Sequence, residues 1–139
     1  YLREIEETLI RLLARHGLAA GRSPGATGVW IGGEKIAAMG LHLSHWVSTH
    51  GFALNLETDL EPFSWIVPCG LRGRGVTSLR AQLGASVPRE RIETELVEEA
   101  AARFGRTPHR LAPEAFLEAL EAVERLPQAR APAAARPAQ

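Results

Sequence analysis

The chain is poor in several features that would direct it to particular partners. Its 139 residues, enough for one globular core, include a single cysteine, Cys69, which excludes an internal disulfide and fits a reducing cytoplasm. Sixteen basic and sixteen acidic residues cancel, so net charge does not favour nucleic acid or a membrane surface. No apolar run approaches the roughly 20 residues that span a bilayer. We therefore expect a cytoplasmic domain that binds neither nucleic acid nor membrane.

The first forty residues predict a helix followed by a hairpin. Apolar residues recur at helical spacing over residues 1–16, and Gly17 is a natural residue just past a helix end. Residues 21–25 are expected to form a loop. Two short apolar runs within residues 28–40 flank Gly32-Gly33, a pattern typical of a β-hairpin. Because the chain begins with Tyr1 inside a helical pattern, we expect the first part of a longer protein to precede it.

The middle of the chain predicts further short elements. Residues 41–43 and 52–56 are strand candidates, and residues 58–65 fit one short helix with a polar residue at its start. Residues 76–83 are ambiguous between strand and helix. Together with the N-terminal helix and hairpin, this order predicts an α+β or mixed α/β domain.

Two helices are expected after the strands, one opened by Pro88 and stopped by Gly105, the other opened by Pro113 and ended by Pro127. Residues 128–139 contain only Ala, Pro, Arg and Gln, so they predict a disordered tail. The expected apolar stripes of the two helices are Ile92, Leu96, Val97, Ala100 and Phe104, then Phe116, Leu117, Leu120 and Val123.

Cys69 allows two interpretations. Free cysteine is among the most buried residue types, so Cys69 can be a core residue. Pro68 ends a central strand, Gly70 allows a tight turn, and the nearby arginines Arg72 and Arg74 favour a thiolate. These neighbours favour a nucleophile without excluding the core residue.

A thiol nucleophile needs a group that takes or offsets its proton. Arginine stays charged and cannot act as a base, which leaves Lys35, the only lysine of the chain, and the histidines. Lys35 can equally be a solvated residue of a hairpin strand, and His50 is a second possible base.

Two other kinds of site find little support. His42 and His45 would point to opposite faces of a strand, and only one thiol is available, so we expect no metal site. The glycines of residues 70–75 lack the Gly-Lys-Ser/Thr ending of a phosphate-binding P-loop.

Residues 70–89 hold four arginines and no acid. This stretch is either a solvated loop or a docking patch for an acidic protein.

Six ordered motifs resemble the lipoyl (octanoyl) transferase family, over residues 1 to about 84. They are Gly28-Val29-Trp30-Ile31, Lys35-Ile36-Ala37-Ala38-Met39-Gly40, His50-Gly51-Phe52-Ala53-Leu54-Asn55, Asp59-Leu60, Pro68-Cys69-Gly70 and Val76-Thr77-Ser78-Leu79. The resemblance implies a biotin/lipoate protein ligase-like fold, a mixed sheet flanked by helices.

The resemblance also implies residue roles. Cys69 matches the thiol that accepts the acyl group, and Lys35 matches the lysine that activates it and shuttles protons. Two short stretches match the lining of the acyl pocket; they are Ala38, Met39 and Gly40, then Gly51, Phe52 and Ala53.

By this resemblance the protein moves an octanoyl group from octanoyl-acyl carrier protein to a lysine of lipoyl domains, through an acyl-cysteine. The implied acceptors are the lipoyl domains of 2-oxoacid dehydrogenases and the glycine cleavage H protein. No cofactor is expected because the thioester is already activated, and a monomer is expected because no helix carries a heptad seam. Two alternatives stay open: an ATP-dependent lipoate or biotin ligase-like enzyme, and a homologue that binds acyl chains or lipoyl domains without turnover.

One departure from the family concerns the N-terminal side. Members carry an earlier segment with an Arg-Gly-Gly motif and a Thr-Tyr-His-Gly-Pro-Gly-Gln-like run, which this chain lacks. We therefore expect residues 1–127 to be the C-terminal part of a single octanoyltransferase catalytic domain, with extra helices over residues 88–126.

Overall fold

The computed structural model describes residues 1–66 and 73–124, and these divide after residue 108 into two compact units. The first unit contains helix α1 (Leu2–Arg15), four strands, a 3-10 helix η1 (Glu61–Trp65), and helices α2 (Leu79–Leu83) and α3 (Arg89–Phe104). The second contains helix α4 (Pro113–Glu124). The expected mixed α+β class is confirmed.

The sheet has the order β1-β2-β3-β4, and every neighbouring pair of strands is antiparallel. The strands are β1 (Gly21–Ser23), β2 (Ala26–Ile31), β3 (Glu34–Ser44) and β4 (Val47–Leu54). The only parallel pairing found within the described residues is an isolated bridge between Lys35 and Val76. The expectation of a loop over residues 21–25 was wrong in part, because Gly21–Ser23 pairs with β2 and only Pro24 and Gly25 form the turn.

The predicted turn at Gly32-Gly33 is confirmed. Both glycines have positive φ, 56° and 90°, as a two-residue turn of the mirror-image type requires. The strand expected at residues 41–43 is not separate, because β3 continues unbroken to Ser44. The strand expected at 52–56 begins earlier and ends at Leu54. Residues 76–83 resolve into a bridge at Val76 followed by α2, and the short helix expected at 58–65 is the 3-10 helix η1.

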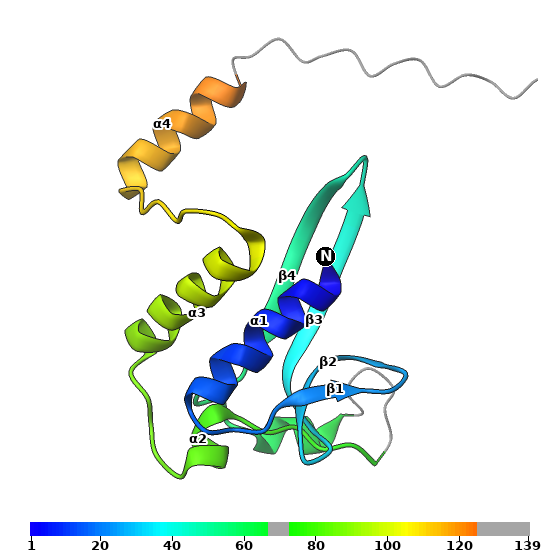
Figure 1. The fold of residues 1–139 in the computed structure, drawn as a ribbon. Helices are drawn as coiled ribbons and strands as arrows, with labels where there is room; N and C mark the ends of the chain where they lie inside the picture. The colour runs from blue at the N-terminus through cyan, green and yellow to red at the C-terminus, as the bar shows by residue number, and fades with distance from the viewer. Residues whose placement is uncertain (67–72, 125–139) are drawn as a thin grey trace, which may run out of the picture. The chain divides into compact units, whose positions relative to one another are not determined.

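Helix α1 covers one face of the sheet (Figure 1) and contributes three of the eight residues of the core cluster. Its apolar residues recur every three or four positions, which places them on one side. The core cluster combines them with residues of the sheet, α2 and α3: Leu9, Leu12, Leu13, Val29, Ile36, Ala37, Leu79 and Ile92. Because Ile36 and Ala37 are consecutive, both can face α1 only where the strand is irregular, and β3 has a bulge there: Trp30 pairs with Lys35 but Val29 pairs with Ala37.

Polar contacts fasten α1 to its neighbours. Glu6 is fully buried and accepts hydrogen bonds from Arg3, Arg22 and the Gly28 amide, at 2.7, 3.0 and 3.1 Å. At the other end of α1, the His16 Nε2 atom lies 2.6 Å from a carboxylate oxygen of Glu95 on α3. These contacts hold α1 against β2 and α3. They therefore determine which face of the sheet α1 leaves uncovered.

The expected helix bounds after Pro88 are close to those observed. Helix α3 starts directly after Pro88 and ends at Phe104, and the next residue, Gly105, takes a left-handed conformation. Of its expected stripe, Ile92 is buried, whereas Val97 and Phe104 are exposed. Helix α4 begins at Pro113 as expected, and the four residues of its expected apolar stripe are all exposed. Pro127 and the tail 128–139 lie outside the described residues.

Candidate functional site

The face of the sheet opposite α1 carries the only lysine of the chain. Val29 faces the core, and side chains alternate along a strand, so Gly28 and Trp30 lie on the opposite face. Lys35 is the registered partner of Trp30 and shares that face. We call it the lysine face.

The two stretches predicted to bind an acyl chain are direct neighbours in the sheet. Ala38 pairs with Ala53, Met39 with Phe52 and Gly40 with Gly51. Ala37 faces the core, so alternation places the Ala38–Ala53 and Gly40–Gly51 pairs on the lysine face. Four of the six predicted binding residues therefore share a face with Lys35, and all four are too small to fill the space above the sheet.

Met39 and Phe52 point the other way. Met39 packs against the core cluster, and Phe52, its registered partner, is 39% exposed. The predicted stretches therefore present one small-residue surface on the lysine face and one apolar pair on the core face.

The Lys35 side chain is held by two residues of β2. Its Nζ atom lies 4.9 Å from the ring centroid of Trp30, a cation–π contact. Beneath its stem lies Gly28, where an added Cβ would sit 3.4 Å from Lys35 Cε and 3.5 Å from Cδ. Neither Gly28 nor Trp30 was assigned a role from the sequence, although a two-residue turn at 32–33 already implies that residue 30 faces residue 35.

The backbone of Lys35 joins β3 to residues 75–77. Its N–H donates to the Gly75 carbonyl at 2.9 Å, and its carbonyl accepts from the Thr77 N–H at 3.0 Å. Asn55, just after β4, donates from its amide side chain to the Thr77 carbonyl at 3.1 Å. Residues 73–78 are thus tied to the two strands that carry the predicted site. Cys69 itself, with Pro68, Gly70 and Arg72, lies outside the described residues.

The arginines near the cysteine differ in their surroundings. Arg74 donates a hydrogen bond to the Ser23 hydroxyl, and its guanidinium lies 5.0 Å from the Trp30 ring centroid. Arg89 is paired with Glu93 on its own helix at 2.6 Å. Arg80 lines a hollow together with three acidic residues, Glu57, Asp59 and Glu61. Of the three described arginines in this stretch, Arg74, Arg80 and Arg89, one is therefore paired with an acid and one shares a hollow with acidic residues.

The histidines do not gather. His42 lies on β3 opposite Thr49, His50 lies on β4 opposite Leu41, and His45 is in the turn between the strands. Across residues 1–66 and 73–124, no three His, Cys, Asp or Glu side chains form a group able to hold a metal ion. Over the same residues, no helix has both the length and the apolar character to cross a membrane.

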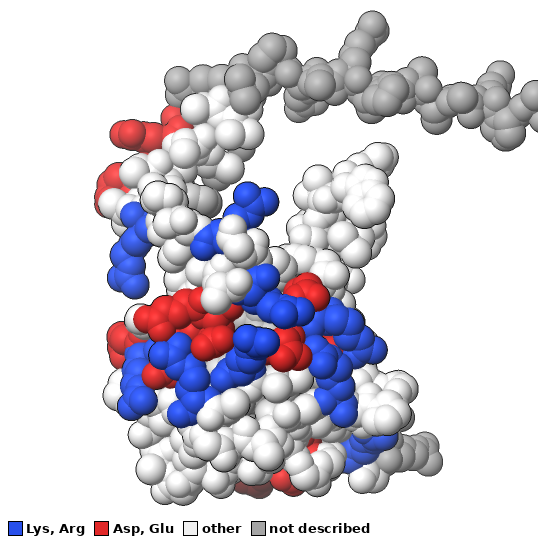
Figure 2. Space-filling model, in the orientation of Figure 1, with Lys and Arg blue, Asp and Glu red and all other residues white. Residues whose placement is uncertain are grey.

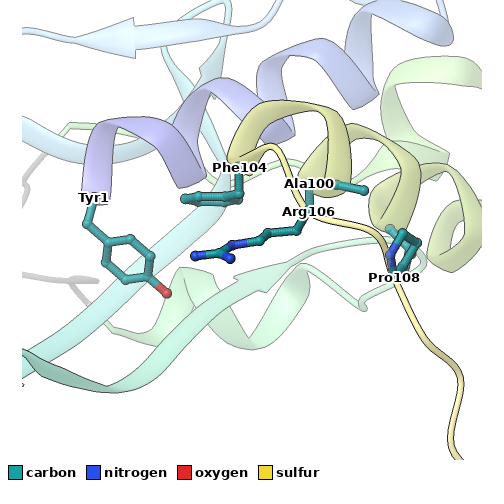
Figure 3. A pocket seen from close by; sticks show the side chains of 7 residues that line it. Tyr1, Ala100, Phe104, Arg106 and Pro108 are labelled. Carbon is teal, nitrogen blue, oxygen red and sulfur yellow. The ribbon is translucent and has the colours of Figure 1, made fainter.

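A separate apolar cavity of about 390 Å³ lies between the start of α1 and the end of α3 (Figure 3). Arg106 extends across it toward Tyr1, beside the Phe104 ring. The lining residues are Tyr1, Val97, Ala100, Ala101, Phe104, Arg106 and Pro108. None of them is a predicted site residue.

Comparison with known proteins agrees with the motifs. Residues 1–101 match the model of the lipoyl protein ligase A/B catalytic domain, which extends past residue 84 into α3. An octanoyltransferase of Rubrobacter xylanophilus is 51% identical over 98 residues, 70% of this chain and 44% of the relative. One of Flavobacterium johnsoniae is 48% identical over 103 residues, covering 70% and 44%, and one of Solibacter usitatus 56% over 81 residues, covering 58% and 36%.

The chain therefore spans less than half the length of these relatives. The family match nevertheless covers most of the chain, and it includes the strands that carry Lys35 and the paired small-residue stretches. The chain belongs to the lipoyl protein ligase A/B catalytic domain family.

Proposed function

We propose that the protein carrying this chain is an acyltransferase that moves an octanoyl group from octanoyl-acyl carrier protein to a lysine of lipoyl domains. The observation that carries the proposal is the lysine face, where Lys35 and four small residues of β3 and β4 lie together. The names of the relatives, all octanoyltransferases, support the acyl group and the reaction class.

In the first half-reaction, Lys35 takes the proton of Cys69 and the thiolate attacks the thioester carbonyl. The bond from the acyl carbon to the carrier sulfur breaks, and the carrier thiol leaves with the proton from Lys35. The product is an acyl-cysteine. The small residues Ala38, Gly40, Gly51 and Ala53 leave room for the alkyl chain, whose burial contributes about 0.8 kcal/mol per CH₂.

In the second half-reaction, the acceptor lysine arrives as an ammonium ion and gives one proton to Lys35. Its amine attacks the acyl-cysteine, an amide forms, and Cys69 leaves and takes the remaining proton of the amine. One proton per cycle passes from Lys35 to water. No step uses a metal, nucleotide or other cofactor. The proposal includes a cytoplasmic monomer with the acceptors named above, the 2-oxoacid dehydrogenase lipoyl domains and the H protein.

The test is intact-protein mass spectrometry after incubation with octanoyl-acyl carrier protein and no acceptor. The complete natural polypeptide and this 139-residue chain are compared, each beside Cys69→Ser and Lys35→Gln. We expect one hydroxylamine-labile octanoyl group on the complete polypeptide, none on Cys69→Ser, and acylation at least about 100-fold slower for Lys35→Gln, the usual loss on removal of a general base.

Different outcomes point to the alternatives. Octanoyl transfer that survives Cys69→Ser and requires ATP would identify a ligase. Binding of octanoyl-acyl carrier protein without any covalent product would identify a non-catalytic homologue. Acylation of the complete polypeptide but not of the 139-residue chain would show that residues outside this chain complete the site.

A further inference from the structure

We propose that Trp30 is a positioning residue, which holds the Lys35 side chain at the place where it exchanges protons with the substrates. This inference rests on the proposed function, because it presumes that Lys35 transfers protons. It adds a residue to which the sequence motifs assigned no role.

The geometry restricts Lys35 from two sides. Trp30 stands directly across from it in the β2–β3 pairing, and the Lys35 Nζ atom lies 4.9 Å from the ring centroid. Gly28, two residues earlier on the same face, supports the aliphatic stem from beneath. A lysine normally has four freely rotating bonds, so this seat confines a side chain that would otherwise sample many rotamers.

Trp30 is itself held firmly enough to act as a support. The side chain is 5% exposed although it lies on the face opposite the core, and the Arg74 guanidinium lies 5.0 Å from the same ring. Arg74 is in turn anchored by its hydrogen bond to Ser23 on β1. The indole N–H finds no acceptor among residues 1–66 and 73–124, so Trp30 is placed by packing and by the two cations rather than by a hydrogen bond of its own.

The chemistry favours Trp over other large residues at this position. The indole ring has the strongest cation–π attraction of the aromatic side chains, and Phe keeps a weaker version of it, whereas Leu fills part of the volume with none. Positioning a proton-transfer group matters because catalytic rates depend steeply on the geometry of the reacting groups. Trp30→Phe and Trp30→Leu therefore separate the contact with Lys35 from the filling of space.

The experiment measures the rate of Cys69 acylation by octanoyl-acyl carrier protein in the complete natural polypeptide. Trp30→Leu is expected to slow acylation about tenfold and Trp30→Phe less than about threefold. In a Lys35→Gln background, Trp30→Leu is expected to have no further effect. Ile92→Ala, a buried substitution on α3 away from the lysine face, is the matched control for lost stability, and urea unfolding of each variant shows that it is folded under the assay conditions.

A second readout does not depend on activity. The protons on Lys35 Cε, assigned by their loss in Lys35→Gln, are expected to resonate upfield of solvated lysine because they lie near the face of an indole ring. The upfield shift should vanish in Trp30→Leu and persist in part in Trp30→Phe.

Four results would overturn the inference. Equal slowing by Trp30→Leu with and without Lys35, or equal slowing by Ile92→Ala of the same stability, would show that Trp30 acts only through the fold. An unshifted Lys35 signal in the wild type would show that the contact is absent. A wild-type protein that shows the shift but forms no acyl-cysteine would refute the proposed function, and with it this role, while leaving the contact itself established.

Discussion

Two of the hairpins in the sheet share β3, and they are built in opposite ways. We call the β2–β3 pair the first hairpin and the β3–β4 pair the second hairpin. The β2–β3 hairpin turns on two glycines, is buried on its core face by α1, and holds Lys35 on its other face. The β3–β4 hairpin turns on His45 and Trp46, both with positive φ, and ends in exposed residues. Residues 36–56 contain no Asp, Glu, Lys or Arg, and the projecting end of this hairpin is uncoloured in Figure 2.

The difference shows how one strand serves two purposes. Near its start, β3 is held by packing, by the bulge at Ile36 and by hydrogen bonds to residues 75–77. These contacts hold in place the part of the strand that carries Lys35. Near its end, β3 pairs with β4, and the small pairs Ala38–Ala53 and Gly40–Gly51 leave an open surface between these two regions. The predictions below test this contrast.

The largest effect is expected for Gly28→Ala, at the base of the first hairpin. Gly28 has φ +119°, and an added Cβ would lie 2.5 Å from the Ala37 carbonyl oxygen. A left-handed non-glycine residue costs about 1–3 kcal/mol and overpacking a similar amount, so the free energy of unfolding should fall by about 4 kcal/mol. Urea unfolding measures this.

Gly21→Ala is the control for that substitution, because Gly21 has nothing within 4 Å of the added Cβ and no positive φ. Its effect should stay within about 0.5 kcal/mol. A loss of less than about 1 kcal/mol for Gly28→Ala would mean that β2 and β3 are not held together as closely as the contact implies.

The next largest loss of stability is expected for Glu6→Gln, on the helix α1 that packs against the first hairpin. Burial opposes ionisation of Glu6, but hydrogen bonds from Arg3, the Gly28 amide and Arg22 outweigh it and hold the pKa of Glu6 below its usual 4.5. Losing the charge weakens three hydrogen bonds to a buried carboxylate, so we expect a loss of about 2 kcal/mol at pH 7.

The pH dependence gives this prediction its sign. A carboxyl group with a lowered folded-state pKa contributes stability above its unfolded-state pKa, and that contribution is lost as the pH falls through the folded-state value. The gap between wild type and Glu6→Gln should therefore be widest near pH 7 and shrink below about pH 4.5. Exposed Glu90→Gln is the control, and a gap that stays constant from pH 7 to pH 3 would contradict the role of the Glu6 charge.

Substitutions in the turns of the two hairpins should change the free energy of unfolding by smaller amounts and in opposite directions. His45→Asn with Trp46→Gly replaces residues at φ 49° and 63° by residues that tolerate them, and should stabilise by about 1 kcal/mol. Gly33→Ala, at φ 90°, should destabilise by about as much. Chemical unfolding of the wild type and of the two variants measures both changes. If the double substitution in the β3–β4 turn does not raise the free energy of unfolding, the left-handed residues of that turn carry no strain.

The sequence predicted the first hairpin better than the second for a physical reason. Gly32-Gly33 between apolar runs is a strong local signal, and it implies the Trp30–Lys35 pairing. The turn at His45 and Trp46 uses residues that rarely adopt positive φ, so no local signal indicates it, and the sequence pattern predicts a separate strand over residues 41–43. Strand β1 was missed because three residues ending in a proline turn form a strand only when a partner is present.

The candidate site was likewise predictable from the sequence only in part. Motifs pointed to Lys35 and to the two small-residue stretches, and the register places four of those six residues with Lys35. The opposite orientation of Met39 and Phe52 depends on the bulge at Ile36, which shifts the alternation along β3 and leaves no signature in composition or spacing. The roles of Cys69 and Lys35 stay predictions for the acylation experiment.

The same substitution at two tryptophans gives the smallest and most direct test of the contrast. Trp46 is 100% exposed at the tip of the second hairpin, so Trp46→Phe should change the free energy of unfolding by less than about 0.5 kcal/mol. Trp30→Phe removes part of a buried ring that contacts two cations, and should cost about 1 kcal/mol. Each is measured by urea unfolding monitored by circular dichroism, which does not depend on either tryptophan. Equal losses at both positions would mean that the tip of the second hairpin is packed in solution, and that the two hairpins are supported alike.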